Sequence, residues 1–337
     1  MTMKLKGMAA AFVAAASLLA VAAPSHAAAV ITNGTVTLGV DDLGQLNVPG
    51  TPSSGGTSYV GLRYNATGSE ATAPGCLCEG WGVGLVSSGI SGYANNSAGT
   101  SGLSLVSFAS TATTATSITR VGSSLEITHY YHPSTTANLY QVDVSIKNIS
   151  GSTIAAGDLV YRRVMDWDVE PTAFDEYVTI NGVPLALGLA NGNNIRGTGD
   201  NGFASSNPLS GDLRSLVCPV NTNFTDCGPS DHGALFDFEF ESLVDGATKL
   251  FTTFYGAAGN ESDALAALGS VGAGLYSLGQ TSTDPAGGKP NTFIFGFGSK
   301  GGVLQPPRSV PEPGSMALLG LGFAGLAAFR RKQKRAA

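Results

Sequence analysis

The chain has 337 residues, a formal net charge of −6, 46 glycines and only 12% charged residues. This acidity disfavours binding to nucleic acid, which requires basic patches against phosphate groups. Leucine, isoleucine, valine and phenylalanine are frequent enough to argue against wholesale disorder, and the abundant glycine, serine and threonine favour many short strands joined by turns.

Residues 1–27 have the pattern of a secretory signal peptide. Lys4 and Lys6 precede an apolar run, and Ser25-His26-Ala27 places small residues around a cleavage site. A buried N-terminal helix is the alternative, but the alanine-rich run carries little bulk for a core. We therefore expect a signal helix, export through the Sec translocon, and cleavage by signal peptidase after Ala27.

The chain contains four cysteines, at Cys76, Cys78, Cys218 and Cys227. An even number in an exported chain favours disulfides, and four cysteines allow three pairings. The short loop containing Pro219 favours Cys218 with Cys227, which leaves Cys76 with Cys78 as a tight ring. A four-cysteine zinc site is the alternative, although C-x-C lacks the usual C-x2-C spacing.

Several segments alternate apolar and polar residues with the period of a half-buried β-strand. Between Leu139 and Asn148 the inward set is Tyr140, Val142, Val144 and Ile146. Residues 236–241 place three phenylalanine rings on one face and three acids on the other. The predicted strands are residues 125–131, 139–148, 159–169, 236–241, 250–255 and 293–297. This pattern predicts an all-β fold, namely an antiparallel β-sandwich, with the large supersandwich as one type that fits.

The remaining segments of the body are a short helix and loops. Residues 260–268 predict a helix with Asn260 or Ser262 as N-cap and an end at Gly269. Glycine-rich residues 191–207 predict a long surface loop, and residues 284–290 predict another. Because the predicted strands share the same alternation of apolar and polar residues, we expect residues 28–300 to form one domain.

Three acids alternate in Asp166-Trp167-Asp168-Val169-Glu170. If the strand continues through them, Asp166, Asp168 and Glu170 share one face, and they can bind Ca²⁺ with help from Asp175 or Glu176. Arg162 lies on the same face, so a paired surface network is the alternative, which we favour. We therefore expect no cofactor, with Ca²⁺ at these acids as the alternative.

The sequence contains no recognisable catalytic set. It has no G-x-S-x-G elbow, H-E-x-x-H, P-loop, or G-x-G-x-x-G after a strand. His129 and His132 point to opposite faces of a strand, and His232 lies in a turn. Trp81 and Trp167 can stack on sugars, but tryptophans in strands usually belong to the core. We expect no enzyme activity; the alternative is a carbohydrate-binding module or carbohydrate-active enzyme.

The C-terminal segment has three features in order. Pro311-Glu312-Pro313 prevents a helix from continuing upstream. The uncharged run 316–329 follows, short for the ~20 residues of a comfortable transmembrane helix, although Gly314 and Ser315 extend it. The basic residues that mark the cytoplasmic end of a membrane anchor are Arg330, Arg331, Lys332, Lys334 and Arg335. Residues 301–309 read as a linker to this segment.

Val310-Pro311-Glu312-Pro313, the apolar run and the terminal basic cluster resemble the PEP-CTERM sorting signal over residues 310–337. The resemblance implies handling by exosortase, a membrane enzyme of Gram-negative bacteria that make extracellular polysaccharide. It implies inner-membrane anchoring with the body in the periplasm, then a place at the cell surface or in the extracellular matrix, with polysaccharide as a candidate partner. An ordinary C-terminal anchor is the alternative.

The body itself carries two further indications. Seven of the 18 basic and one of the 24 acidic residues lie in the two terminal segments, so the body has a net charge near −12. Cations are therefore plausible partners. Residues 75–82, 161–171 and 276–280 resemble blocks of uncharacterised exported bacterial proteins, a resemblance that implies no particular activity.

Overall fold

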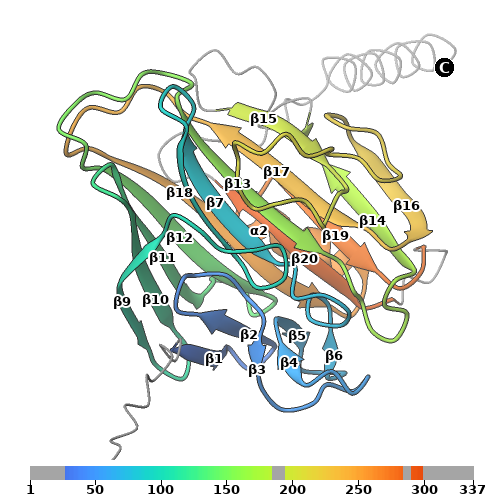
Figure 1. Ribbon diagram of the computed structural model, residues 1–337. Helices are drawn as coiled ribbons and strands as arrows, with labels where there is room; N and C mark the ends of the chain where they lie inside the picture. The colour runs from blue at the N-terminus through green and yellow to red at the C-terminus, as the bar shows by residue number, and fades with distance from the viewer. Residues whose placement is uncertain (1–26, 184–193, 284–289, 299–337) are drawn as a thin grey trace, which may run out of the picture.

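The computed structural model describes residues 27–183, 194–283 and 290–298 of the chain. The expected signal peptide, linker, sorting motif and membrane anchor lie outside the described residues. Two antiparallel sheets, one of nine strands and one of five, form a β-sandwich (Figure 1). The predicted fold class is confirmed.

The nine-stranded sheet contains most of the predicted strands. Its strands in spatial order are β16 (Phe224–Ser230), β14 (Glu176–Asn181), β19 (Leu275–Gln280), β20 (Thr292–Gly298), β18 (Thr248–Ala258), β12 (Leu139–Asn148), β11 (Leu125–Pro133), β10 (Ala115–Val121) and β9 (Ser104–Ser110). The five-stranded sheet has the order β15 (Asn194–Gly199), β17 (Gly233–Glu239), β13 (Leu159–Asp166), β7 (Gly80–Leu85) and β8 (Ile90–Asn95).

Shorter elements complete the fold. A small sheet at one end of the sandwich has the order β1 (Ala28–Thr32), β2 (Val36–Asp41), β5 (Leu62–Tyr64) and β6 (Ser69–Glu70) (Figure 1). Beside it lies the pair β3 (Val48–Pro49) and β4 (Tyr59–Val60), and the helix α2 (Glu261–Ser270) follows β18. No helix within the described ranges is long and apolar enough to cross a membrane.

Aromatic side chains from both sheets fill the core. Phe236 and Phe238 of β17 lie with ring centroids 4.7 and 4.8 Å from that of Phe297 on β20. Such rings bury a large apolar area and prefer tilted contacts. The predicted inward face of β12 is confirmed, since its four members are fully buried: Tyr140, Val142, Val144 and Ile146.

The outward face of β17 differs from the prediction. Asp237, expected at the solvent, is 2% exposed, and its carboxylate accepts a hydrogen bond of 2.6 Å from Nε of Arg162. Residues 205–214, which come before β17 in the chain, explain this difference because they cover that face. Ser205 and Ser210 accept from the Arg162 guanidinium, and Arg214 donates to Asp237.

Three predicted boundaries are corrected. The strand that begins at Leu159 ends at Asp166 and not at residue 169. Within the predicted loop 191–207, residues 194–199 form the edge strand β15; its glycines face the chain around Arg214, where side chains would collide. The helix passes Gly269 and ends at Ser270, while Asn260 is its N-cap and accepts from the Asp263 amide at 2.9 Å.

Candidate functional site

The candidate site lies where the chain leaves the five-stranded sheet at the end of β13 and enters the nine-stranded sheet at β14. The Trp167 ring, fully buried, packs against the backbone of Gly279 on β19, and its Nε1 donates to Ser277 Oγ at 3.0 Å. After the end of β13 the backbone bonds to a different segment: the Asp168 amide donates to Ala71 O at 2.8 Å. The crossover is therefore held on both sides.

The three blocks singled out in the sequence meet at this crossover. Residues 75–82 run into β7, which pairs with β13 so that Trp81 lies opposite Arg163. Residues 276–280 belong to β19, on which Trp167 packs. The blocks thus form one structural unit, although they are far apart in the sequence.

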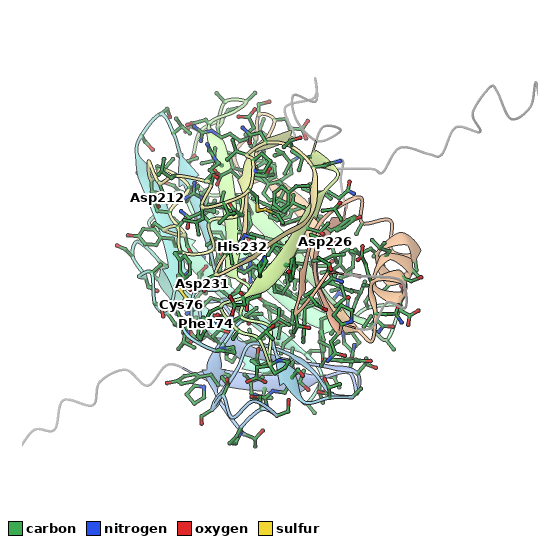
Figure 2. All side chains as sticks on the ribbon, turned by 90° about the vertical axis from the view of Figure 1, so that its right-hand side faces the viewer. Cys76, Phe174, Asp212, Asp226, Asp231 and His232 are labelled. Atoms are coloured by element: carbon green, nitrogen blue, oxygen red, sulfur yellow. A yellow bond between two sulfur atoms is a disulfide. The ribbon has the colours of Figure 1, made fainter. Side chains whose placement is uncertain are left out.

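Three aspartates come together in this unit. Asp166, Asp168 and Asp231 each offer a carboxylate oxygen, and these oxygens lie within 4.8 Å of one another. Asp166 is 1% exposed and Asp168 is 0% exposed, whereas Asp231 is exposed. Figure 2 labels Asp231 close to Cys76 and Phe174 on the face turned to the viewer. We call Asp166, Asp168 and Asp231 the aspartate cluster.

The buried carboxylates of this cluster lack hydrogen-bond donors. With these groups ionised, no donor among the described residues reaches Oδ1 of Asp166, either oxygen of Asp168, or Oε2 of the neighbouring Glu176; a proton on Asp168 can be shared with Asp166. Cys76 Sγ lies 3.3 Å from Asp166 Oδ2, but Cys76 is bonded to Cys78 and its sulfur carries no proton to donate. Burying carboxylates without donors or a counter-charge is costly.

The nearby cationic side chains are engaged elsewhere. Arg162 pairs with Asp237 at 2.6 Å, and Arg163 pairs with Glu79 at 2.7 Å. The paired network expected between Arg162 and the alternating acids is therefore wrong. The reason is that residues 205–214 bring Arg162 a different set of partners, as described above.

His232 stands next to the cluster but directs both ring nitrogens away from its carboxylates. Nδ1 lies 3.0 Å from Asp200 Oδ2, and Nε2 lies 3.3 Å from the backbone oxygen of Glu176. Both partners accept hydrogen bonds, so the His232 ring donates to at least one of them.

The electrostatic consequence is a set of carboxylates that resist ionisation. Burial raises the pKa of Asp168, and the negative charges of Asp166, Glu176 and Asp231 raise it further. Burial and the charge of Asp231 raise the pKa of Asp166. Burial raises the pKa of Glu176 to about 8, against the opposing effect of backbone hydrogen bonds. These groups need either protons or a cation.

Glu170 does not join the cluster that the sequence predicts for it. Its oxygens accept hydrogen bonds from Ser53 Oγ at 2.5 Å, Thr57 Oγ1 at 2.8 Å, and the amides of Gly55 and Glu70 at 3.2 and 3.0 Å. Burial opposes ionisation, but these donors outweigh it and lower the pKa of Glu170. The face assignment fails because β13 ends at Asp166 and the alternation ends with it.

Asp231 occupies the position that was expected for Glu170, and the sequence pattern did not indicate it. It lies in the turn before β17, and β17 pairs with β13 so that Gly233 lies opposite Asp166. Continuing this antiparallel register by two residues would have placed residue 231 opposite residue 168. Of the two expected helpers, Glu176 adjoins the cluster and its charge acts on Asp168, whereas Asp175 acts on Asp231.

A strained segment lies beside the cluster. Phe174 has φ of +80°, a conformation rare for a bulky residue, and its amide donates to Glu176 Oε1 at 2.7 Å. The ring is 49% exposed and lies over Gly75, where any side chain would collide with it. This segment fixes one oxygen of Glu176 and leaves the other free.

The cysteines form two disulfides, Cys76–Cys78 and Cys218–Cys227. The favoured pairing is confirmed, and the four cysteines do not supply the thiolates that a zinc site requires. Of the histidines, His129 is fully buried and His132 lies on the other face of β11, within 3.4 Å of Asp143.

Residues 309–332 match the family model of the PEP-CTERM protein-sorting motif. No curated protein gives a significant match to the chain. The motif supports an exported protein that is anchored through its C-terminal region and processed by exosortase. It covers Val310, Pro311, Glu312 and Pro313, which lie outside the described residues.

Proposed function

We propose that this is an exported surface or extracellular-matrix protein without catalytic activity, processed by exosortase among extracellular polysaccharide. The observation that carries the proposal is the sorting motif at residues 309–332. In this proposal the tail holds the body at the inner membrane until exosortase releases it. Two disulfides in the body are in keeping with an oxidising compartment.

The buried position of the acids supports a noncatalytic role. Glycosidase acids flank a sugar bond in an open cleft, but Asp166 and Asp168 are 1% and 0% exposed. A hollow of about 380 Å³ between α2 and residues 135–138 contributes one acid, Asp263, which is bound to the N-cap Asn260. A single capping acid does not make an acid and base pair.

The carbohydrate-directed alternative receives no support from the tryptophans. Stacking on a sugar requires an exposed ring, and both Trp81 and Trp167 are 0% exposed. Trp81 Nε1 donates to Leu43 O at 2.9 Å inside the core. Carbohydrate binding or cleavage therefore stays a prediction.

The sorting step is tested with a full-length chain carrying an epitope tag between Ser152 and Thr153, an exposed turn. In a host that carries exosortase, we expect the native chain to lose its tail and reach the surface or medium. Replacement of Pro311, Glu312 and Pro313 by alanine should leave an unprocessed, membrane-bound chain.

A matched control separates the motif from the general effect of removing prolines. Pro306 and Pro307 lie just before the matched residues, and their replacement by alanine should leave processing unchanged. Equal processing of the native chain and the Pro311-Glu312-Pro313 variant would overturn the exosortase role.

A further inference from the structure

Outside the sorting tail, the aspartate cluster is the feature whose chemistry is least explained by folding alone. Four buried carboxylate oxygens in this place have no donor among the described residues, on Asp166, Asp168 and Glu176. Two other buried acids are matched: Glu170 by four donors and Glu79 by Arg163. A folded protein retains such an unmatched group where something else compensates it.

We propose that Asp166, Asp168 and Asp231 bind one divalent cation of the calcium class. Their oxygens are within 4.8 Å of one another, close enough for one ion to touch all three at oxygen distances of about 2.3–2.6 Å. Glu176 adds negative charge and an unmatched oxygen beside Asp168.

The ligand atoms of the cluster determine which type of ion it can bind. The cluster offers carboxylate oxygens only, because Cys76 Sγ is part of a disulfide and both nitrogens of His232 are engaged. Oxygen donors suit hard cations, whereas zinc and copper favour nitrogen and sulfur. Several carboxylates around one ion suit Ca²⁺ better than Mg²⁺, which keeps most of its water.

The surroundings hold the buried ligands and leave an entrance. A side chain at Gly202 would lie 2.8 Å from Asp166 Oδ1, so Gly202 packs directly against this ligand. Asp168 is held through its amide bond to Ala71 O. Asp231 is exposed, so an ion and its remaining water ligands have access from solvent.

The test uses the full chain, purified in mild detergent and stripped with a chelator that is then removed. Calorimetric titration with CaCl₂ at neutral pH should show one site with a Kd of about 10⁻⁴–10⁻³ M, the range of extracellular modules. Calcium at tenfold this Kd should raise Tm by about 3 °C. MgCl₂ should bind at least about tenfold more weakly.

Substitutions identify the ligands. Asp168→Asn and Asp231→Asn should each weaken Ca²⁺ binding more than about tenfold. In the calcium-free protein Asp168→Asn should not lower Tm, because no donor among the described residues loses its acceptor. Two controls should bind as the native protein does: Glu170→Gln, outside the cluster, and Asp245→Asn, an exposed acid bound to the Gly151 amide.

Several results would overturn the proposal. One is the absence of both heat and a Tm change in the native protein up to about 10 mM Ca²⁺, above the weakest range expected. In that case the carboxylates hold protons instead of an ion. Native-like binding by Asp168→Asn, or equal binding of Mg²⁺, would also contradict it. The native titration decides even if a variant fails to fold, and it is independent of tail processing.

Discussion

Glu170 and Asp168 are two residues apart in the chain and both are buried, yet their surroundings are opposite. Glu170 accepts from two hydroxyl groups and two amides, and its pKa is lowered. Asp168 accepts from no donor among the described residues, and burial together with neighbouring acids raises its pKa. The loop of residues 53–57 makes the difference, because it wraps one carboxylate and leaves the other to the aspartate cluster.

This comparison separates carboxylates that stabilise the fold from carboxylates that are available for a ligand. Burial alone does not distinguish them, since Glu79, Glu170 and Asp168 are all almost fully buried. The two kinds differ in the number of hydrogen-bond donors around the carboxylate. Removing a matched carboxylate should therefore cost stability, and removing an unmatched one should not.

The largest effect is expected at Glu79, the acid that is paired with the fully buried Arg163. It pairs with Arg163, accepts from Tyr255 OH at 2.6 Å, and accepts from the Leu46 amide at 2.6 Å. Glu79→Gln leaves the Arg163 charge buried without a counter-charge and should lower the free energy of unfolding by about 3–5 kcal/mol. Chemical denaturation measures the change.

The control for this prediction is Tyr255→Phe, which removes one hydrogen bond to the Glu79 carboxylate and should cost about 1.5–3 kcal/mol. If Glu79→Gln costs no more than Tyr255→Phe, the ion pair does not stabilise the core and the comparison fails at its strongest point.

A smaller loss is expected at Glu170. Glu170→Ala leaves Ser53, Thr57 and two amides without their acceptor and should lower the free energy of unfolding by about 2 kcal/mol. Glu170→Gln keeps one acceptor oxygen and should cost less. Proteolysis within residues 53–57 should accelerate in the alanine variant, and an unchanged cleavage rate would show that Glu170 does not hold this loop.

The smallest effect is a pH dependence that comes from His129. Burial, and next the charge of Arg163, lower the pKa of His129 well below its usual 6.5 in the folded protein. The unfolded chain therefore takes up a proton first as the pH falls below 6.5. The stability contributed by the neutral ring is complete above that pH and falls by up to about 1.4 kcal/mol per pH unit below it.

Comparison with His129→Gln isolates this contribution from the carboxylates of the aspartate cluster, whose raised pKa values add a pH dependence of their own. Glutamine can still reach the hydroxyl of Tyr161, which lies 3.1 Å from His129 Nε2. Denaturation at pH 5.0–6.5 should give a steeper loss of stability for the native protein. Parallel curves would mean that His129 takes up its proton equally in both states.

Much of the sandwich was predictable because its central strands carry a clean period of two. The interpretation of β12 was correct at both ends and on its inward face, and the rings of β17 were correctly placed in the core. The helix α2 was found from its polar start and its N-cap Asn260. The edge strand β15 was mistaken for a loop because its glycines were taken as a sign of turns. They are instead required by the close packing of β15 against Arg214.

The site was predictable only in part. Asp166 and Asp168 were identified from their alternation, but Glu170 was assigned with them because nothing local marks the end of β13. Asp231 lies far along the chain, and only the pairing of β13 with β17 brings it to Asp166. The pairing of Cys218 with Cys227 was favoured because loop closure between near neighbours is a local property.

The sequence alone determined the strand periodicity, the sandwich class, the favoured disulfide and the sorting motif, because each is written in residues that are close together in the chain. Only the tertiary structure decided which acids are matched by donors, because those donors come from distant segments. The separation of Glu170 from Asp168 is the clearest case: the pattern treats them alike, and the loop of residues 53–57 reaches only one of them.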